Sequence, residues 1–240
     1  MSTSDMLRSL QSAQWPADTL LGSLTAETRS MLFQVSHTIS HPPGTTLLRE
    51  GDTCATASFI LDGTVKIAAH TATGTETLLG LRGAGNMIGE ASALRPGTPQ
   101  ATTAQAATAV LVQTMSTHTL SRMLTTHPDL TINLCRAIES HLRWANRRQL
   151  DTTIRKASTR LAILLLELVD NHADLIDGRG QLPPLTQHDL GSLAGMAHRT
   201  VEKAIADLRP HGLTVHYRRI NITTIDKLRQ FAQQALNDPR

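Results

Sequence analysis

Between about Val35 and Val112, apolar residues occur in short, β-branched segments that turn-forming residues interrupt. The turn signals are Pro43-Gly44, Glu50-Gly51-Asp52, Asp62-Gly63, Thr73-Gly74, Gly83-Ala84-Gly85 and Pro96-Gly97. Turns separated by roughly 8–12 residues favour an all-β sandwich or barrel. The alternation of Phe59, Leu61, Val65 and Ile67 around one of these turns predicts a β-hairpin over 57–67, with its apolar side chains on one face.

The pattern changes to a helical one after Pro128. Apolar residues recur at Leu130, Leu134, Ile138 and Leu142, and His127-Pro128-Asp129 is a suitable helix start. A second, strongly apolar helix is expected over 160–169 and a loop over 170–184, so a separate small core must bury that helix. We therefore expect three parts, namely an N-terminal domain over 1–126, a long helix and hinge over 127–153, and a C-terminal domain over 154–240.

The segment 186–209 has the pattern of a helix-turn-helix. Thr186 can cap a short helix with Leu190, Leu193 and Ala194 inward, and Gly195 permits a tight turn. The second helix, over 198–209, turns Val201, Ala204, Ile205 and Leu208 inward and Arg199, Lys203 and Ala206 outward. Two long cations near its N-terminal end are suitably placed to meet base edges in DNA.

Residues 213–222 alternate as a two-stranded wing with a basic tip, which places Arg218 and Arg219 near phosphate. The alternative is an ordinary helical hairpin in a core, with Arg199 and Lys203 merely solvated. Cap, turn, spacing and wing agree with one another, and this agreement favours DNA binding.

Charge supports a nucleic-acid partner. The chain has 240 residues and a net charge of +3, and the stretch 186–231 alone holds seven basic and four acidic residues, so it accounts for the whole net charge. A mildly basic, solvated surface would explain the charge equally well if it stood alone.

Other features exclude several classes of protein. Cys54 and Cys135 form no CxxC pair, which disfavours a disulfide framework and a structural zinc site. The longest apolar run, 161–166, is far below the roughly 20 residues of a membrane span, and no secretory signal is evident, so we expect a cytoplasmic protein. No catalytic motif is evident either. Gly83-Ala84-Gly85 begins like a dinucleotide-binding fingerprint but lacks its third glycine. We therefore expect that the protein is not an enzyme.

The order of motifs from about Leu20 to Leu236 resembles the Crp/Fnr family of bacterial transcription regulators. The resemblance rests on Pro43-Gly44, 49–52, 59–66, Met87-Ile88-Gly89-Glu90 and the helix-turn-helix. It implies an α+β fold with a cyclic-nucleotide-binding-like β-roll, a long dimerisation helix and a C-terminal winged helix-turn-helix. It also implies a homodimer joined along 129–151 through Leu134, Ile138, Leu142 and Ala145. The alternative is that this apolar stripe packs inside one subunit.

The resemblance implies a palindromic double-stranded DNA operator and contact with RNA polymerase. Its DNA-binding residues would be Gln187, His198, Arg199, Thr200, Lys203, Arg218 and Arg219. The usual recognition helix begins Ser-Arg-Glu-Thr-Val-x-Arg, whereas this chain has Ala-His-Arg-Thr-Val-Glu-Lys over 197–203. Arg199 replaces a glutamate that accepts from cytosine with a donor suited to guanine, so we expect a different operator.

The resemblance also implies an effector site at Gly89, Glu90, Gln100, Ala101, Ala145 and Asn146. In cAMP-binding members an Arg-Ser pair stands where this chain has Gln100-Ala101, and a Thr-Ser pair stands where it has Ala145-Asn146. An amide and a methyl group cannot replace a guanidinium and a hydroxyl at a phosphate, so we do not expect ordinary cAMP binding. The alternative is that Gly89 only makes a turn and Glu90 is solvated.

Other effectors of the family divide into one that is excluded and two that stay open. Residues 1–53 contain no cysteine, which excludes the family's iron–sulfur sensor. Haem stays open because the chain has 11 histidines, among them His70, His118 and His141. Cyclic-di-GMP stays open too, with Arg82, Arg95, Arg143 or Arg147 as its cations. A β-roll that regulates a protein partner without touching DNA is the third class of function.

Overall fold

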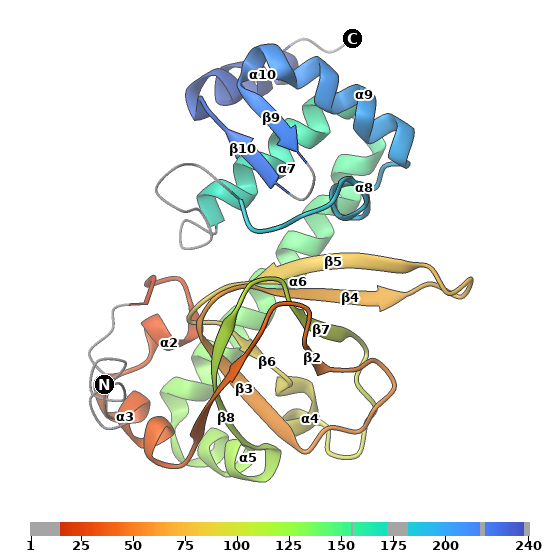
Figure 1. Ribbon diagram of the computed structural model, residues 1–240. Coiled ribbons are helices and arrows are strands. Elements are labelled where there is room, and N and C mark those ends of the chain that lie inside the picture. The colour runs from red at the N-terminus through yellow and green to blue at the C-terminus, as the bar shows by residue number, and fades with distance from the viewer. Residues whose placement is uncertain (1–14, 155, 172–181, 217–218, 238–240) are drawn as a thin grey trace. The chain divides into compact units, whose positions relative to one another are not determined.

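The computed structural model describes residues 15–154, 156–171, 182–216 and 219–237 (Figure 1). Contacts divide the chain into two compact units, one formed by Met1–Ala69 with Leu81–Leu142 and the other by His70–Gly80 with Arg143–Arg240. The predicted fold class is confirmed, since a β-rich N-terminal part, a long helix and a helical C-terminal part with a two-stranded sheet follow one another along the chain.

The N-terminal part contains two four-stranded sheets, which form the predicted β-roll. One sheet has the order β1-β8-β3-β6 and the other the order β2-β7-β4-β5. The strands are β1 (His37–His41), β2 (Thr46–Leu48), β3 (Thr56–Asp62), β4 (Val65–His70), β5 (Glu76–Arg82), β6 (Met87–Ile88), β7 (Thr103–Ala106) and β8 (Val110–Ser116). The helices are α2 (Leu20–Ser23), α3 (Ala26–Gln34), α4 (Glu90–Leu94), α5 (Thr117–Thr126) and α6 (Pro128–Ile154). Helix α6 belongs to this unit up to Leu142 and to the second unit from Arg143 on.

The hairpin predicted over 57–67 is wrong. Strands β3 and β4 belong to different sheets, so the turn at Gly63 passes the chain from one sheet to the other. The backbone of Gly63 has a φ of +85°, and a Cβ there would lie 2.1 Å from the carbonyl oxygen of Ala109, so only glycine fits. The apolar side chains are also not confined to one face, contrary to the prediction. Phe59 and Ile60 point to opposite faces of β3, and both are fully buried.

The two faces of β3 contribute to two separate cores. Phe59 and Leu61 pack in a cluster with residues of α2, α3, α5 and the start of α6. Ile60 packs in the other cluster, with Val65, Ala104 and Val112 from strands of both sheets. The sheet β1-β8-β3-β6 is therefore covered on both faces, by helices on one and by the second sheet on the other.

The long helix is confirmed as α6, Pro128–Ile154. Its first turn is attached to α3, because the carboxylate of Asp129 accepts hydrogen bonds from Thr25 and Thr28. Leu134 is 3% exposed and lies in the helix-covered core of the N-terminal part. This corrects its predicted place on a dimer-facing stripe, since its side chain packs against its own subunit.

The C-terminal unit contains the expected winged helix-turn-helix. Its elements are α7 (Ala157–Asn171), α8 (Gln187–Ala194), α9 (His198–Leu208), the 3₁₀ turn η2 (Arg209–His211), β9 (Leu213–His216), β10 (Arg219–Ile222) and α10 (Ile225–Asn237). Helix α7 is longer than the predicted 160–169, and Leu161, Leu164, Leu165 and Leu168 fill the core. Most of the loop predicted over 170–184 lies outside the described residues.

Among the described helices, none combines the length and the apolar character that a membrane span requires.

Candidate DNA interface and effector site

The helix-turn-helix is built as its sequence predicts. The backbone N–H of Asp189 donates to Thr186 Oγ1 at 3.0 Å, and the backbone N–H of Thr186 donates to Asp189 Oδ2 at 2.7 Å, which completes a capping box at the start of α8. Gly195 ends α8 in the left-handed conformation, with a φ of +61°. A Cβ there would lie 2.6 Å from Thr152 Cγ2, so the last turn of α6 packs closely against this turn.

Helix α9 has one buried and one exposed face. Val201, Ala204, Ile205 and Leu208 are buried, as predicted. The predicted contact residues His198, Arg199, Thr200 and Lys203 are all exposed. The exposed face also carries Glu202, whose Oε1 lies 3.7 Å from His198 Nδ1. Gln187, the first residue of α8, is half-buried. The exposed face of α9 is thus free of contacts with the core and presents two long cations.

The wing is confirmed as a two-stranded antiparallel sheet of β9 and β10, in which Arg219 is paired with His216 (Figure 1). Arg219 is exposed. Arg218, the other predicted phosphate contact, lies outside the described residues. The wing therefore offers one described cation beside the helix-turn-helix.

The predicted effector residues near α4 have distinct roles. Gly89 precedes α4 with a φ of +81°, and a Cβ there would lie 2.8 Å from the carbonyl oxygen of Thr56, so this position requires glycine. Gln100 is 7% exposed, and its Nε2 donates to Ser92 Oγ. The carbonyl of Gln100 also accepts from Gly51 N at 2.9 Å. Gln100 is therefore a neutral, buried residue held by hydrogen bonds to Ser92 and Gly51, while Ala101 beside it is exposed.

Arg82 at the end of β5 and Glu90 at the start of α4 are half-buried and close enough to interact electrostatically. Burial raises the pKa of Glu90, although its own backbone hydrogen bond and Arg82 oppose the shift. Burial likewise lowers the pKa of Arg82, and Glu90 opposes that change. Both side chains keep part of their surface exposed. Since Glu90 is half-buried, the interpretation of this residue as simply solvated is wrong.

The other residues weighed for an effector are less enclosed. Arg95, Arg143 and Arg147 are exposed, and so are Ala145 and Asn146 on α6. Of the histidines considered for haem, His70 and His118 are exposed and His141 is half-buried. Within the described ranges, no group of three or more His, Cys, Asp or Glu side chains is arranged to hold a metal ion.

An exposed apolar stripe runs along α6. Ile138 and Leu142 are 37% and 59% exposed, and Cys135 and Ala145 are exposed as well. These four residues alternate at spacings of three and four, as the a and d positions of a coiled coil do. Cys135 was not among the predicted stripe residues, although its spacing from Ile138 and Leu142 would have placed it there.

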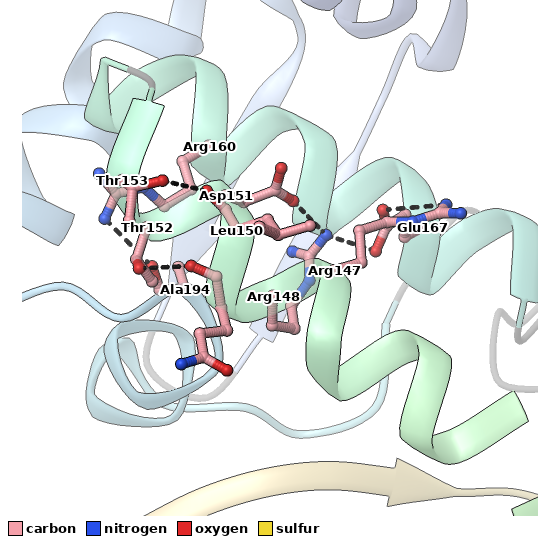
Figure 2. Close-up of polar contacts among 10 residues, drawn as sticks. Arg147, Arg148, Leu150, Asp151, Thr152, Thr153, Arg160, Glu167 and Ala194 are labelled. Atoms are coloured by element: carbon pink, nitrogen blue, oxygen red, sulfur yellow. Dashed lines mark hydrogen bonds and ion pairs between the residues drawn. The ribbon is translucent and has the colours of Figure 1, made fainter. Parts of the chain in front are cut away.

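Sequence reasoning also missed a buried charge cluster at the end of α6. Figure 2 shows the guanidinium of Arg148 between the carboxylates of Asp151 and Glu167. Asp151 stands one helical turn after Arg148, but nothing in the linear sequence connects either residue to Glu167. The same view includes Arg160, whose Nη1 donates to the carbonyls of Ala194 and Gly195 at 3.3 and 3.2 Å.

Comparisons with known proteins agree with both halves of this description. Residues 38–127 match the model of the cyclic nucleotide-binding domain, and residues 159–231 match the Crp-like helix-turn-helix domain. A CRP-like cAMP-activated global transcriptional regulator of Mycobacterium tuberculosis is 30% identical over 175 residues, which cover 72% of this chain and 78% of that protein.

Solved structures show the same fold. The c-di-GMP responsive global regulator CLP of Xanthomonas campestris has a TM-score of 0.70 at 19% identity, covering 83% of this chain and 100% of that one. FixK2 of Bradyrhizobium japonicum has a TM-score of 0.67 at 20% identity, covering 82% of this chain and 96% of that one.

Proposed function

Because the chain belongs to the Crp/Fnr family of DNA-binding transcription regulators, we propose that it acts in the cytoplasm as a homodimer that reads a palindromic operator. The observation that carries this proposal is the geometry of α9, where Arg199 and Lys203 are exposed opposite a fully buried apolar face. In this function Arg199 contacts a guanine edge in the major groove, and Arg219 on the wing contacts phosphate. RNA polymerase is the proposed protein partner, and we propose no catalytic activity.

The proposed dimer forms along α6. Its contact surface is the exposed stripe of Cys135, Ile138, Leu142 and Ala145. A single helix with large apolar side chains on its solvent face gains stability when a second copy covers them. Two-fold symmetry in the protein then requires two-fold symmetry in the operator.

The proposed effector is a small molecule with an anionic group, bound inside the β-roll between Arg82 and Glu90. The relative from Mycobacterium tuberculosis is described as cAMP-activated, and the structural neighbour from Xanthomonas campestris as c-di-GMP responsive. In this chain Gln100 is neutral and bonded to Ser92, and we assign Arg82 as the cation for a phosphate. Its partly exposed guanidinium is suited to an anion, and Glu90 to a hydroxyl donor.

Selection from a pool of random DNA duplexes tests the DNA-binding part of the proposal. We expect the full-length protein to enrich a palindrome. Enrichment of a single half-site would contradict the dimer, and no enrichment would favour the alternative in which the β-roll acts on a protein partner.

Thermal unfolding with cAMP, cGMP and cyclic-di-GMP tests the effector part. A ligand at 100 times its Kd stabilises by about 2.7 kcal/mol. We expect a rise in Tm with at least one of the three that Arg82→Gln removes. If none raises Tm, an absorption spectrum after addition of haemin tests the alternative of a haem sensor.

A further inference from the structure

Arg148 joins α6 to α7 through a buried ionic contact. Arg148 is among the most enclosed charged residues of the described part of the chain, with 9% of its side chain exposed. Its Nη2 donates to Asp151 Oδ2 on α6 at 2.9 Å and to Glu167 Oε2 on α7 at 2.5 Å (Figure 2). The ring of Trp144 lies 5.6 Å from the guanidinium carbon. We call Arg148, Asp151 and Glu167 the Arg148 bridge.

Helix α7 packs chiefly against the other helices of the C-terminal unit. Within the described part of the chain, its most extensive helix–helix contacts are with α9, α10 and α8. Arg147 of α6 also reaches α7, since its Nη1 lies 3.8 Å from Glu167 Oε1. The last turn of α6 touches the helix-turn-helix through Thr152, which packs against Gly195. The Arg148 bridge is the buried ionic contact between α6 and α7, because the side chain of Arg147 is 60% exposed and that of Arg148 only 9%.

The Arg148 bridge lies well away from the connection between α6 and α7, so it can fix the angle between the two helices. At 1.5 Å per residue, Arg148 lies about 9 Å before the end of α6 and Glu167 about 15 Å after the start of α7. A single contact beside the connection between the helices would fix their positions but permit rotation. A second contact at this distance also fixes the angle.

The energetics of such a contact favour a role in geometry over one in stability. Removing two charges from water costs about as much as their attraction returns, so a buried ion pair contributes little net stability. A guanidinium held between two carboxylates is nevertheless strongly directional. A second ion pair on α7 allows a comparison. Arg229 of α10 pairs with Asp170 of α7 at 2.9 Å, but both side chains are about half exposed and neither residue lies on α6.

We propose that Arg148 is a positioning residue that fixes the angle between α6 and the helix-turn-helix, and thereby sets the spacing of the two half-sites that the dimer reads. The inference rests on the proposed homodimer, in which α6 joins the protomers. Each base pair added between half-sites moves them apart by about 3.4 Å and rotates one against the other by about 35°. If the angle is fixed, affinity falls when the spacing between half-sites changes. If the angle can adjust, affinity changes little.

The test measures affinity of the full-length protein for palindromes of different central spacing. Fluorescence anisotropy is recorded on the palindrome enriched by the wild type and on versions one base pair shorter, one longer and two longer. Arg148→Met removes the bridge, Glu167→Gln removes its negative charge on α7 together with the ion pair to Arg147, and Arg229→Met is the matched control. We expect the wild type and Arg229→Met to lose about tenfold in affinity for each wrong spacing, and the two bridge variants only about twofold.

Each result decides the question. Circular dichroism establishes that the variants are folded, and Glu167→Gln keeps the test valid if Arg148→Met does not fold. Unchanged spacing selectivity in a folded bridge variant would overturn the inference while leaving the proposed function intact. An equal loss in Arg229→Met would also overturn it, because any ion pair on α7 would then serve. A wild type that binds no palindrome would contradict both proposals.

Discussion

Arg82 and Glu90 are half-buried residues of opposite charge in the same β-roll, and no direct ion pair joins them in the part of the chain that the structure describes. Burial disfavours the charged form of each side chain, and the attraction between the two charges does not fully offset this cost. Groups held at such a cost are typical of binding sites, where a ligand completes the set of interactions.

Glu90→Gln should raise the Tm of the ligand-free protein at neutral pH. The pKa of Glu90 is raised by burial, so its ionised form destabilises the fold above that pKa. The carboxyl is protonated in both the folded and the unfolded state at low pH, so the advantage of the amide should disappear below about pH 4. Thermal unfolding across pH 4–8 measures this, with Glu76→Gln at the exposed start of β5 as control. A gain at neutral pH that persists unchanged at pH 4 would contradict the prediction.

Arg199→Ala should relax base preference at one position of each half-site. A good arginine–guanine contact discriminates against the wrong base by about 1–3 kcal/mol.

Arg219→Ala should instead weaken binding to all sequences alike and flatten the dependence of log K on log salt by about 1 for each phosphate that the protein no longer neutralises. Binding titrations on single-base variants of the operator at several salt concentrations separate the two. Uniform loss for Arg199→Ala would mean that Arg199 contacts phosphate only.

Asp129→Asn should destabilise the attachment of α6 to α3. Thr28 Oγ1 and Thr25 Oγ1 donate to the Asp129 carboxylate at 2.8 and 3.0 Å. Burial acts to raise the pKa of Asp129, but hydrogen bonds from Thr28 and Thr25 lower it below its usual value overall. Because the site is partly exposed, we expect a cost of about 1 kcal/mol, or roughly 2–4 °C in Tm.

The effect of Asp129→Asn should depend on pH. A carboxylate with a lowered pKa contributes stability above about pH 4 and loses it as the pH falls through the folded-state pKa. Wild type and variant should therefore converge under acidic conditions. Asp226→Asn is the control, since Asp226 also lies in the first turn of a helix but is almost fully exposed. An equal loss in both variants would show that only the helix dipole is involved.

Cys135 should form a disulfide between two copies of the chain under mild oxidation. In a parallel coiled-coil dimer, residues at a and d positions meet their own counterparts across the axis, within the reach of a disulfide. Non-reducing electrophoresis after treatment with diamide should show a covalent dimer for the wild type and for Cys54→Ser, and none for Cys135→Ser. A covalent dimer that depends on Cys54 instead would place the interface elsewhere.

The helix-turn-helix could be predicted from sequence because its determinants are local. The capping box of Thr186 and Asp189 spans four residues, the turn needs one glycine, and α9 buries a regular stripe on one side. Each of these signals lies within a few residues, so no knowledge of the tertiary fold was required.

The errors arose where distant parts of the chain decide the structure. A strand buried on both faces, such as β3, has no period-two pattern, and its neighbours in the sheet are β8 and β6 rather than β4. Leu134 continues the apolar period of α6, but periodicity does not reveal whether a side chain meets its own core or a second subunit. The pairing of Arg148 with Glu167 depends on how two helices are placed, which no spacing within either helix encodes.

The two separate cores on β3 have a consequence for how the protein could diversify. Ile60 faces the interior of the β-roll, while Phe59 and Leu61 face the helices that cover the outside. Substitutions among the interior residues can therefore alter the shape and polarity offered to a small molecule and leave the packing of the outer helices untouched. Under the proposed function, a single strand thus separates the residues that can change with the effector from the residues that hold the outer helices in place.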